Sequence, residues 1–192
     1  MDALTLLTAA EQQLGEVIVG LNDGEMDVVT NCPPWTVRHL ASHALKNQLF
    51  WAGLVTGQDL MEQAEAMAAV PYHGELAPIA AEITARVVHL WRTEGVLQAL
   101  HTTPFGELPG AVVIVFAVVD AAAHAWDLSA SVGRAVEFPA DWIPGLTGVV
   151  EHTCTEHAVE IGLVKSPTEP PAGATATQRL MAAAGRTVPW PA

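Results

Sequence analysis

Cysteines and basic residues are scarce in this 192-residue sequence, and each shortage excludes a class of protein. Two cysteines, Cys32 and Cys154, are too few for a disulfide framework or a CxxC zinc site, so we expect free thiols in a reducing cytosol. Only 8 lysines and arginines stand against 21 acidic residues, which gives a formal net charge of −13. Nucleic acid and anionic membrane surfaces repel a chain this acidic. We therefore expect a small-molecule or protein partner.

Signals for export, membrane insertion and nucleotide binding are also missing. The N-terminus lacks the basic segment and apolar run of a signal peptide, which favours a cytoplasmic protein. The apolar stretch 111–119 is too short to span a bilayer, and Asp120 follows it, so it is typical of a buried helix. We find no glycine-rich phosphate loop, no G-x-S-x-G nucleophile motif and no alternation of strands with helices. A dinucleotide-binding fold is therefore not supported.

Helical periodicity runs through most of the chain. Apolar residues make up 51% of it, enough for a substantial core. Their spacing predicts an all-α protein. Thr36 is a candidate N-cap and Gly133 a candidate C-cap. A short extended segment is expected around Phe105. The expected helices cover about 2–21, 37–55, 78–97, 111–132, 139–164 and 175–184, with part of 61–67 as a further candidate. We expect a single domain, 1–192, with a helical bundle to about 165 and a linker and short terminal helix over about 166–192.

A carboxylate and an imidazole lie four residues apart in the most apolar of these helices. In a helix this spacing places Asp120 and His124 on one face, about one turn apart. The same spacing lets two side chains of one helix share a zinc ion in the H-E-x-x-H motif. A carboxylate in so apolar a helix requires a partner or a metal ion, since burying it unpaired is costly. The alternative is a hydrogen-bonded Asp–His pair that stabilises the core.

A third metal ligand would have to come from another helix, and His43 is the leading candidate. It lies among small and apolar residues in the helix expected over 37–55. His39 lies one turn earlier on the same face and could contribute to the site, although a solvated position near the helix start is favoured. Asp127 follows His124 by three residues and could accept a hydrogen bond from it, as carboxylates behind metal-binding histidines do. A helix-packing role for Asp127 is the alternative.

Three segments resemble a known family. The run Cys32-Pro33-Pro34-Trp35-Thr36-Val37-Arg38-His39-Leu40, followed by His43, resembles the entry to the second helix of DinB-like metal-binding proteins. The segment His124-Ala125-Trp126-Asp127-Leu128 is similar to one in the branch of mycothiol-dependent maleylpyruvate isomerase N-terminal domains. The tail, with Gly185-Arg186 and Pro189-Trp190, resembles an actinobacterial subgroup of that branch. Together the resemblances extend over nearly the whole chain.

This resemblance implies a DinB/YfiT-like four-helix bundle with additional C-terminal helices. It also implies a divalent metal ion, zinc or sometimes nickel, bound by His43, Asp120 and His124. Several relatives use a low-molecular-weight thiol such as mycothiol. Two departures matter: an acidic residue is usual where His39 stands, and the isomerase itself has a glutamate in place of Asp120 and a further C-terminal domain. We therefore do not expect maleylpyruvate isomerisation itself.

Three hypotheses on function follow from these residues. The first is a metal-dependent thiol S-transferase or isomerase acting on an electrophilic small molecule. The second keeps the metal ion but not the thiol, as in a lyase, hydrolase or cyclase of a specialised pathway. The third is a non-catalytic metal- or ligand-binding module. The sequence leaves the oligomeric state open, and analogy with bundles of this type, which often form dimers, makes a homodimer one option.

Overall fold

The computed structural model describes residues 1–57, 70–134, 136–162 and 164–188. The helix considered for 61–67 lies outside these ranges. The observed elements are mostly helical, as predicted, and a short hairpin provides the strands of the described part. In order they are α1 (Ala3–Val19), η1 (Asp23–Glu25), α2 (Val37–Val55), α4 (Leu76–Trp91), β1 (Leu100–Thr103), β2 (Gly106–Pro109), α5 (Gly110–Ser131), α6 (Ile143–Thr153), α7 (Glu156–Glu160) and α8 (Ala176–Ala183).

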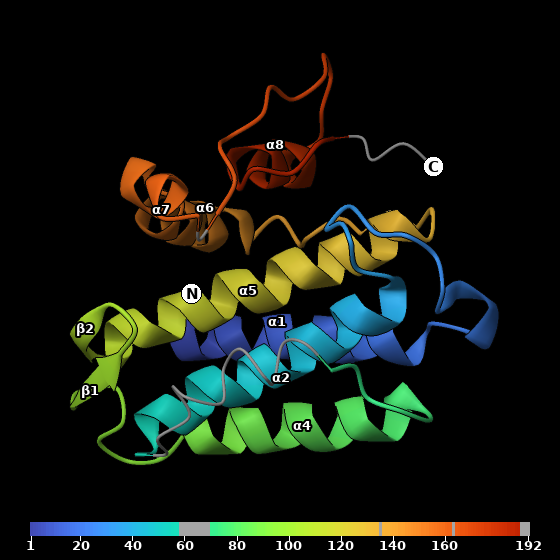
Figure 1. Cartoon of the computed structure of the whole chain (residues 1–192). Helices are drawn as coiled ribbons and strands as arrows, with labels where there is room; N and C mark the ends of the chain where they lie inside the picture. The colour runs from blue at the N-terminus through green and yellow to red at the C-terminus, as the bar shows by residue number, and fades with distance from the viewer. Residues whose placement is uncertain (58–69, 135, 163, 189–192) are drawn as a thin grey trace.

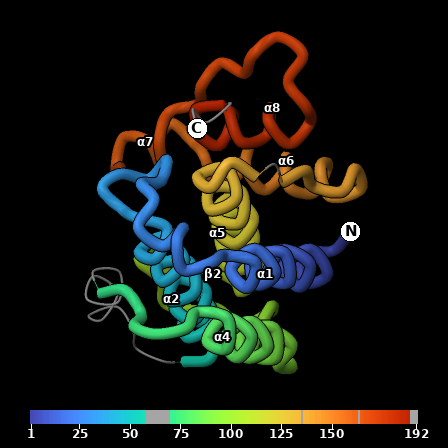
Figure 2. Tube along the Cα trace, turned by 90° about the vertical axis from the view of Figure 1, so that its right-hand side faces the viewer, coloured from blue at the N-terminus to red at the C-terminus, as the bar shows by residue number. Residues whose placement is uncertain are grey.

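Four long helices, α1, α2, α4 and α5, form a bundle around one apolar core (Figure 1). Viewed along the bundle, α5 lies between α1 and α2 and across from α4 (Figure 2). The apolar spacing that predicts each helix also determines which face is buried: in α1, Leu7, Leu14 and Ile18 are almost fully enclosed. Helix α2 begins and ends at the predicted residues. It begins at Val37 because Pro33 and Pro34 prevent helix upstream of its N-cap, Thr36.

Helix α5 is apolar on nearly all sides because other helices cover it on several sides. By length and composition alone it could cross a membrane, but 67% of its most apolar window is buried within the molecule. Helices α1 and α2 cover it on one side, and α6 covers the other, with α8 packed on α6 (Figure 1). A helix enclosed in this way is a core helix, which agrees with the interpretation of 111–119 as buried.

The chain departs from the predicted helices in two places. The third long helix ends at Trp91 and not near residue 97, and an antiparallel hairpin of β1 and β2 follows it. At the end of the hairpin, a Cβ on Gly110 would lie 2.0 Å from the carbonyl oxygen of Val96, so only glycine fits there. The helix predicted over 139–164 is divided into α6 and α7, because the Thr155 side chain accepts a hydrogen bond from the Ala158 amide and caps a new helix.

Candidate metal centre

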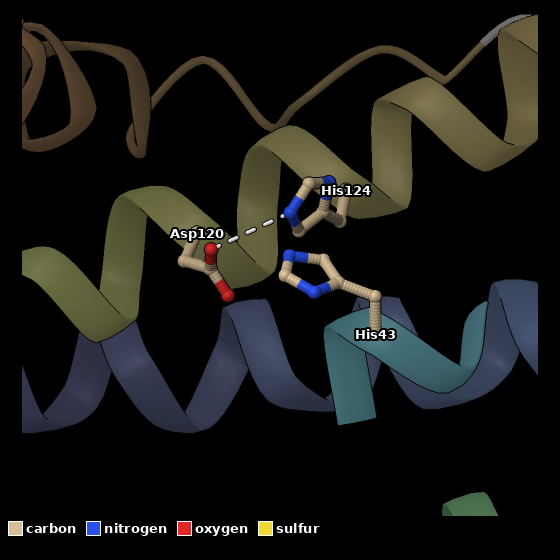
Figure 3. A group of neighbouring side chains, drawn as sticks. All are labelled: His43, Asp120 and His124. Carbon is tan, nitrogen blue, oxygen red and sulfur yellow. Dashed lines mark ion pairs between the residues drawn. The ribbon is translucent and has the colours of Figure 1, made fainter. Parts of the chain in front are cut away.

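His43 from α2 and Asp120 and His124 from α5 point toward one another in the bundle (Figure 3). One ligand atom from each residue lies within 4.8 Å of the other two. The His124 Nε2 atom is 3.4 Å from Asp120 Oδ1, across the one-turn spacing of the two residues. The structure therefore brings together the three residues that the sequence singled out, from stretches more than 70 residues apart.

This donor set fits a divalent metal ion of the zinc type. Two imidazoles and one carboxylate are the ligands of many catalytic zinc sites, in which a fourth position stays open. Ligand atoms bound at about 2.1 Å to one tetrahedral ion lie about 3.5 Å from each other, so small side-chain movements would complete the site. Asp120 does not turn outward into solvent, where it could not bind an ion shared with the two histidines, since its side chain is only 16% exposed.

Two amides from α2 hold the Asp120 carboxylate in place. Asn47 Nδ2 donates to Oδ1 at 2.8 Å, and Gln48 Nε2 donates to Oδ2 at 2.7 Å. The Gln48 amide also donates to the Ala117 carbonyl, at 3.2 Å. Burial disfavours the charged form of Asp120, but the charge of His124 and a hydrogen bond from it outweigh that cost and lower the pKa of the carboxyl. Asp120 is therefore ionised and oriented at neutral pH.

His43 is held as a neutral imidazole. Burial and the nearby His124 lower its pKa to about 4, although Asp120 acts in the opposite direction. The Trp35 ring packs against it with the ring centroids 4.4 Å apart, and the His124 ring lies edge-on at 5.2 Å. A neutral imidazole has a free lone pair, so His43 is ready to bind a cation at physiological pH.

His124 carries a charge in the absence of a metal ion. Burial lowers its pKa, but the ion pair with Asp120 and hydrogen bonds to Asp120 and Asp127 prevail and raise the pKa to about 9. Its Nδ1 atom is 3.2 Å from Asp127 Oδ2, so Nε2 remains for the cluster with His43 and Asp120. A metal ion at Nε2 would replace a proton there.

Asp127 is fully buried and lies behind His124, where the sequence suggested a supporting role. Its Oδ1 accepts a hydrogen bond of 2.7 Å from Asn31 Nδ2, and Arg186 pairs with Oδ2 at 3.0 Å. The Cys32 thiol lies 3.7 Å from Oδ2. Burial and the charge of Asp127 raise the pKa of this thiol to about 12, so Cys32 stays protonated and is not a nucleophile at neutral pH.

His39 lies outside the cluster of three. Its Nδ1 atom shares a hydrogen bond of 3.1 Å with the hydroxyl of the N-cap residue Thr36, and its side chain is partly exposed. A role for His39 in the site stays a prediction.

Sequence reasoning missed Asn47, Gln48, Asn31 and Arg186. Asn47 follows His43 by four residues, so helical spacing could have identified it. Gln48 could have been noticed as a polar residue on an apolar face. Asn31 and Arg186 reach Asp127 from elsewhere in the chain, and no local pattern places them there.

Solved structures share this fold. The chain matches a crystal structure of a mycothiol-dependent maleylpyruvate isomerase with a TM-score of 0.65 and 18% identity, over 90% of this chain and 77% of that one. A second structure of that isomerase, with a histidine-to-alanine substitution, matches with the same TM-score and coverage at 16% identity. At this level of identity the similarity establishes the fold, a DinB-like helical bundle.

A family model points to the same group, and two curated relatives are similar in sequence. Two curated proteins of Mycobacterium tuberculosis, from strains CDC 1551 / Oshkosh and ATCC 25618 / H37Rv, are each 26% identical over 142 residues, which is 71% of either chain. Both are described as uncharacterized proteins. The family model for the mycothiol maleylpyruvate isomerase N-terminal domain matches residues 7–129, which include His43, Asp120, His124 and Asp127. This chain therefore belongs to the family of mycothiol maleylpyruvate isomerase N-terminal domains.

Proposed function

We propose that this protein is a cytoplasmic, metal-dependent enzyme that uses a low-molecular-weight thiol of the mycothiol type. Its reaction would be S-transfer to, or isomerisation of, an electrophilic small molecule. Family membership supports the thiol-dependent class of reaction. The observation that carries the proposal is the convergence of two imidazoles and a carboxylate within 4.8 Å.

His43, Asp120 and His124 would hold the ion, zinc in the first instance and nickel as the alternative. Two neutral imidazoles and one carboxylate leave a divalent ion with a net charge of about +1 and at least one open position. When bound there, such an ion supplies Lewis acidity that lowers the pKa of a thiol and provides a nucleophile at neutral pH.

The remaining steps depend on how this chain positions its own groups. Asn47 and Gln48 hold the Asp120 carboxylate, so its oxygens stay oriented toward the two histidines. Asp127 accepts from Nδ1 of His124 and so directs Nε2 to the centre. The cysteine beside the site, Cys32, keeps its proton. The nucleophilic sulfur would therefore come from a small molecule.

Metal content and thiol-dependent turnover test the proposal. Protein purified without chelator is expected to contain about one equivalent of zinc or nickel by elemental analysis. His43→Ala and His124→Ala should each lose it, whereas His89→Ala, on an exposed position of α4, serves as the control and should keep it. The wild type should also accelerate conjugation of mycothiol to a general electrophile, and both site variants should not.

Two outcomes would contradict the proposal. Full metal content in both site variants would show that the site is assigned wrongly. Stoichiometric metal without thiol-dependent turnover would instead favour a lyase, hydrolase or cyclase at the same site, or a non-catalytic binding module.

A further inference from the structure

The C-terminal segment reaches the candidate metal centre through one side chain, that of Arg186. This residue follows α8 and lies 59 positions after Asp127 in the sequence. Its Nη2 donates to Asp127 Oδ2 at 3.0 Å and its Nε to Oδ1 at 3.3 Å. Two parallel bonds from a guanidinium to a carboxylate fix both the position and the plane of the carboxylate.

Asp127 depends on this contact for its charge balance. Its side chain is 0% exposed, and Asn31 and the Cys32 thiol beside it are neutral donors. His124 adds a hydrogen bond, but an imidazole that binds a metal ion is neutral. With a metal ion bound, Arg186 is then the one cationic side chain on Asp127 among the residues described. An ionised carboxylate buried without a cation would be strongly unfavourable.

A tight backbone turn at the end of α8 places the Arg186 side chain next to Asp127. The amide of Gly185 donates to the Ala182 carbonyl, and the amide of Arg186 donates to Met181. These two bonds form a Schellman motif at the end of α8, which requires a left-handed residue at Gly185, where φ is +82°. A Cβ at Gly185 would lie 2.5 Å from the carbonyl oxygen of Lys165, so only glycine permits the close approach.

The turn also anchors the arginine on both sides. The Arg186 Nη1 donates to the Ala184 carbonyl at 2.8 Å, and the hydroxyl of Thr168 donates to the backbone carbonyl of Arg186. These contacts orient the guanidinium independently of Asp127, and only one-fifth of the Arg186 side chain is exposed. These contacts give the Gly185-Arg186 pair of the tail a structural role.

We propose that Arg186 is a positioning residue of the candidate metal centre, which it influences by fixing Asp127 and, through Asp127, the ring of His124. The inference rests on the proposed metal site. In this arrangement the C-terminal segment is part of the site, although it supplies no ligand. A site of this kind has lower affinity for its metal ion when the supporting carboxylate is disturbed, typically by 10- to 100-fold.

Zinc affinity, measured by chelator competition, tests this in four proteins. Arg186→Met should weaken binding about tenfold or more, and Arg186→Lys less, because an ammonium keeps the charge but not the two parallel bonds. Arg179→Met is the matched control: Arg179 lies on α8, is exposed and donates to the Ala174 carbonyl, so wild-type affinity is expected. Wild-type affinity in folded Arg186→Met would overturn the inference.

The same substitution made in a protein that already carries Asp127→Asn shows whether Arg186 acts through Asp127. In Asp127→Asn, adding Arg186→Met should change zinc affinity by less than about twofold, because the carboxylate that Arg186 fixes is gone. An equal loss in both backgrounds would overturn the inference. This double variant also removes both buried charges, so it remains measurable if Arg186→Met alone does not fold.

Imidazole NMR separates this inference from the metal proposal. In wild type, the His124 Nδ1 proton should be protected from exchange with solvent by Asp127, with or without zinc. Arg186→Met, or Arg186→Lys if the methionine variant does not fold, should lose that protection, and Arg179→Met should keep it. A protein that binds no zinc would disprove the metal site, while retained protection in the Arg186 variant would disprove the role of Arg186.

Discussion

Two fully buried carboxyl groups in this protein have opposite environments. Asp127 on α5 and Glu11 on α1 are both 0% exposed. Asp127 receives hydrogen bonds from four side chains, His124, Asn31, Cys32 and Arg186. Neither oxygen of Glu11 contacts a protein donor among the residues described. Burial alone therefore does not determine whether a carboxyl group in this bundle is charged.

The pKa values of the two groups move in opposite directions. Burial and the charge of Asp120 both raise the pKa of Glu11 well above its ordinary value. Burial also disfavours the charge of Asp127, but Arg186 and the hydrogen bond from His124 outweigh it and lower the pKa. Glu11 is thus a neutral acid inside the core, and Asp127 is a carboxylate that organises the residues around it.

The largest effect is expected from neutralising Asp127. Asp127→Asn leaves the Arg186 guanidinium buried without its counter-charge, so it should lower the free energy of unfolding by about 3–5 kcal/mol at pH 7. Denaturant titration measures this. Glu11→Gln is the matched control, because the same chemical change there removes no ion pair. Similar losses in both variants would break the comparison between the two carboxyl groups.

The pH dependence of stability should identify Glu11 as the protonated group. An acid with a raised folded pKa contributes its full stability below its unfolded pKa and loses it as pH rises toward the folded pKa. Relative to Glu11→Gln, wild type should therefore lose stability as pH rises above about 5, with a slope of at most about 1.4 kcal/mol per pH unit. Parallel unfolding curves across this range for the two proteins would contradict a neutral Glu11.

The pKa values of His43 and His124 are also shifted in opposite directions, and this difference should appear in the pH dependence of zinc binding. The pKa of His43 is about 4 and that of His124 about 9, so at neutral pH only His124 has a proton to release. Zinc affinity should rise about tenfold, or 1.4 kcal/mol, from pH 7 to pH 8 and level off above about pH 9. Calorimetry in buffers of different ionisation enthalpy should detect release of about one proton. Release of two protons already at pH 6, below the pKa of about 7 at which zinc-bound water ionises, would mean that His43 is also charged.

Coupling between Asp127 and Arg186 measures how much of the loss in Asp127→Asn comes from the broken ion pair. The double variant Asp127→Asn/Arg186→Met should be more stable than the sum of the single effects predicts, by at least about 1 kcal/mol. A thermodynamic cycle of the four proteins measures this coupling. Additive losses would show that Arg186 does not provide the charge balance of Asp127.

The sequence predicted most of what one helix can determine by itself. The bounds of α2 and the one-turn spacing of Asp120 and His124 follow from local signals: prolines, an N-cap and the helical period. Because His43 lies among small, apolar residues, the sequence also identified it as the partner on the second helix, and the structure places it there. Metal binding itself stays a prediction.

Contacts between distant segments could not be predicted in the same way. The position of Glu11 fits the buried face of α1, since it lies four residues after Leu7, but a pattern of apolar residues gives no reason to bury an acid there. The pairing of Arg186 with Asp127 depends on how α8 packs over α6, and no spacing in the sequence encodes that packing. The end of α6 at Thr153 was missed because a threonine cap competes with continued helical periodicity.

The close packing of Trp35 against His43 gives the molecule an optical reporter of its own. An indole responds to the electric field around it, and a metal ion bound by the imidazole whose ring centre lies 4.4 Å away would change that field. The spectral difference between wild type and Trp35→Phe isolates this signal from the other tryptophans. Occupancy of the centre could then be followed in real time without a label.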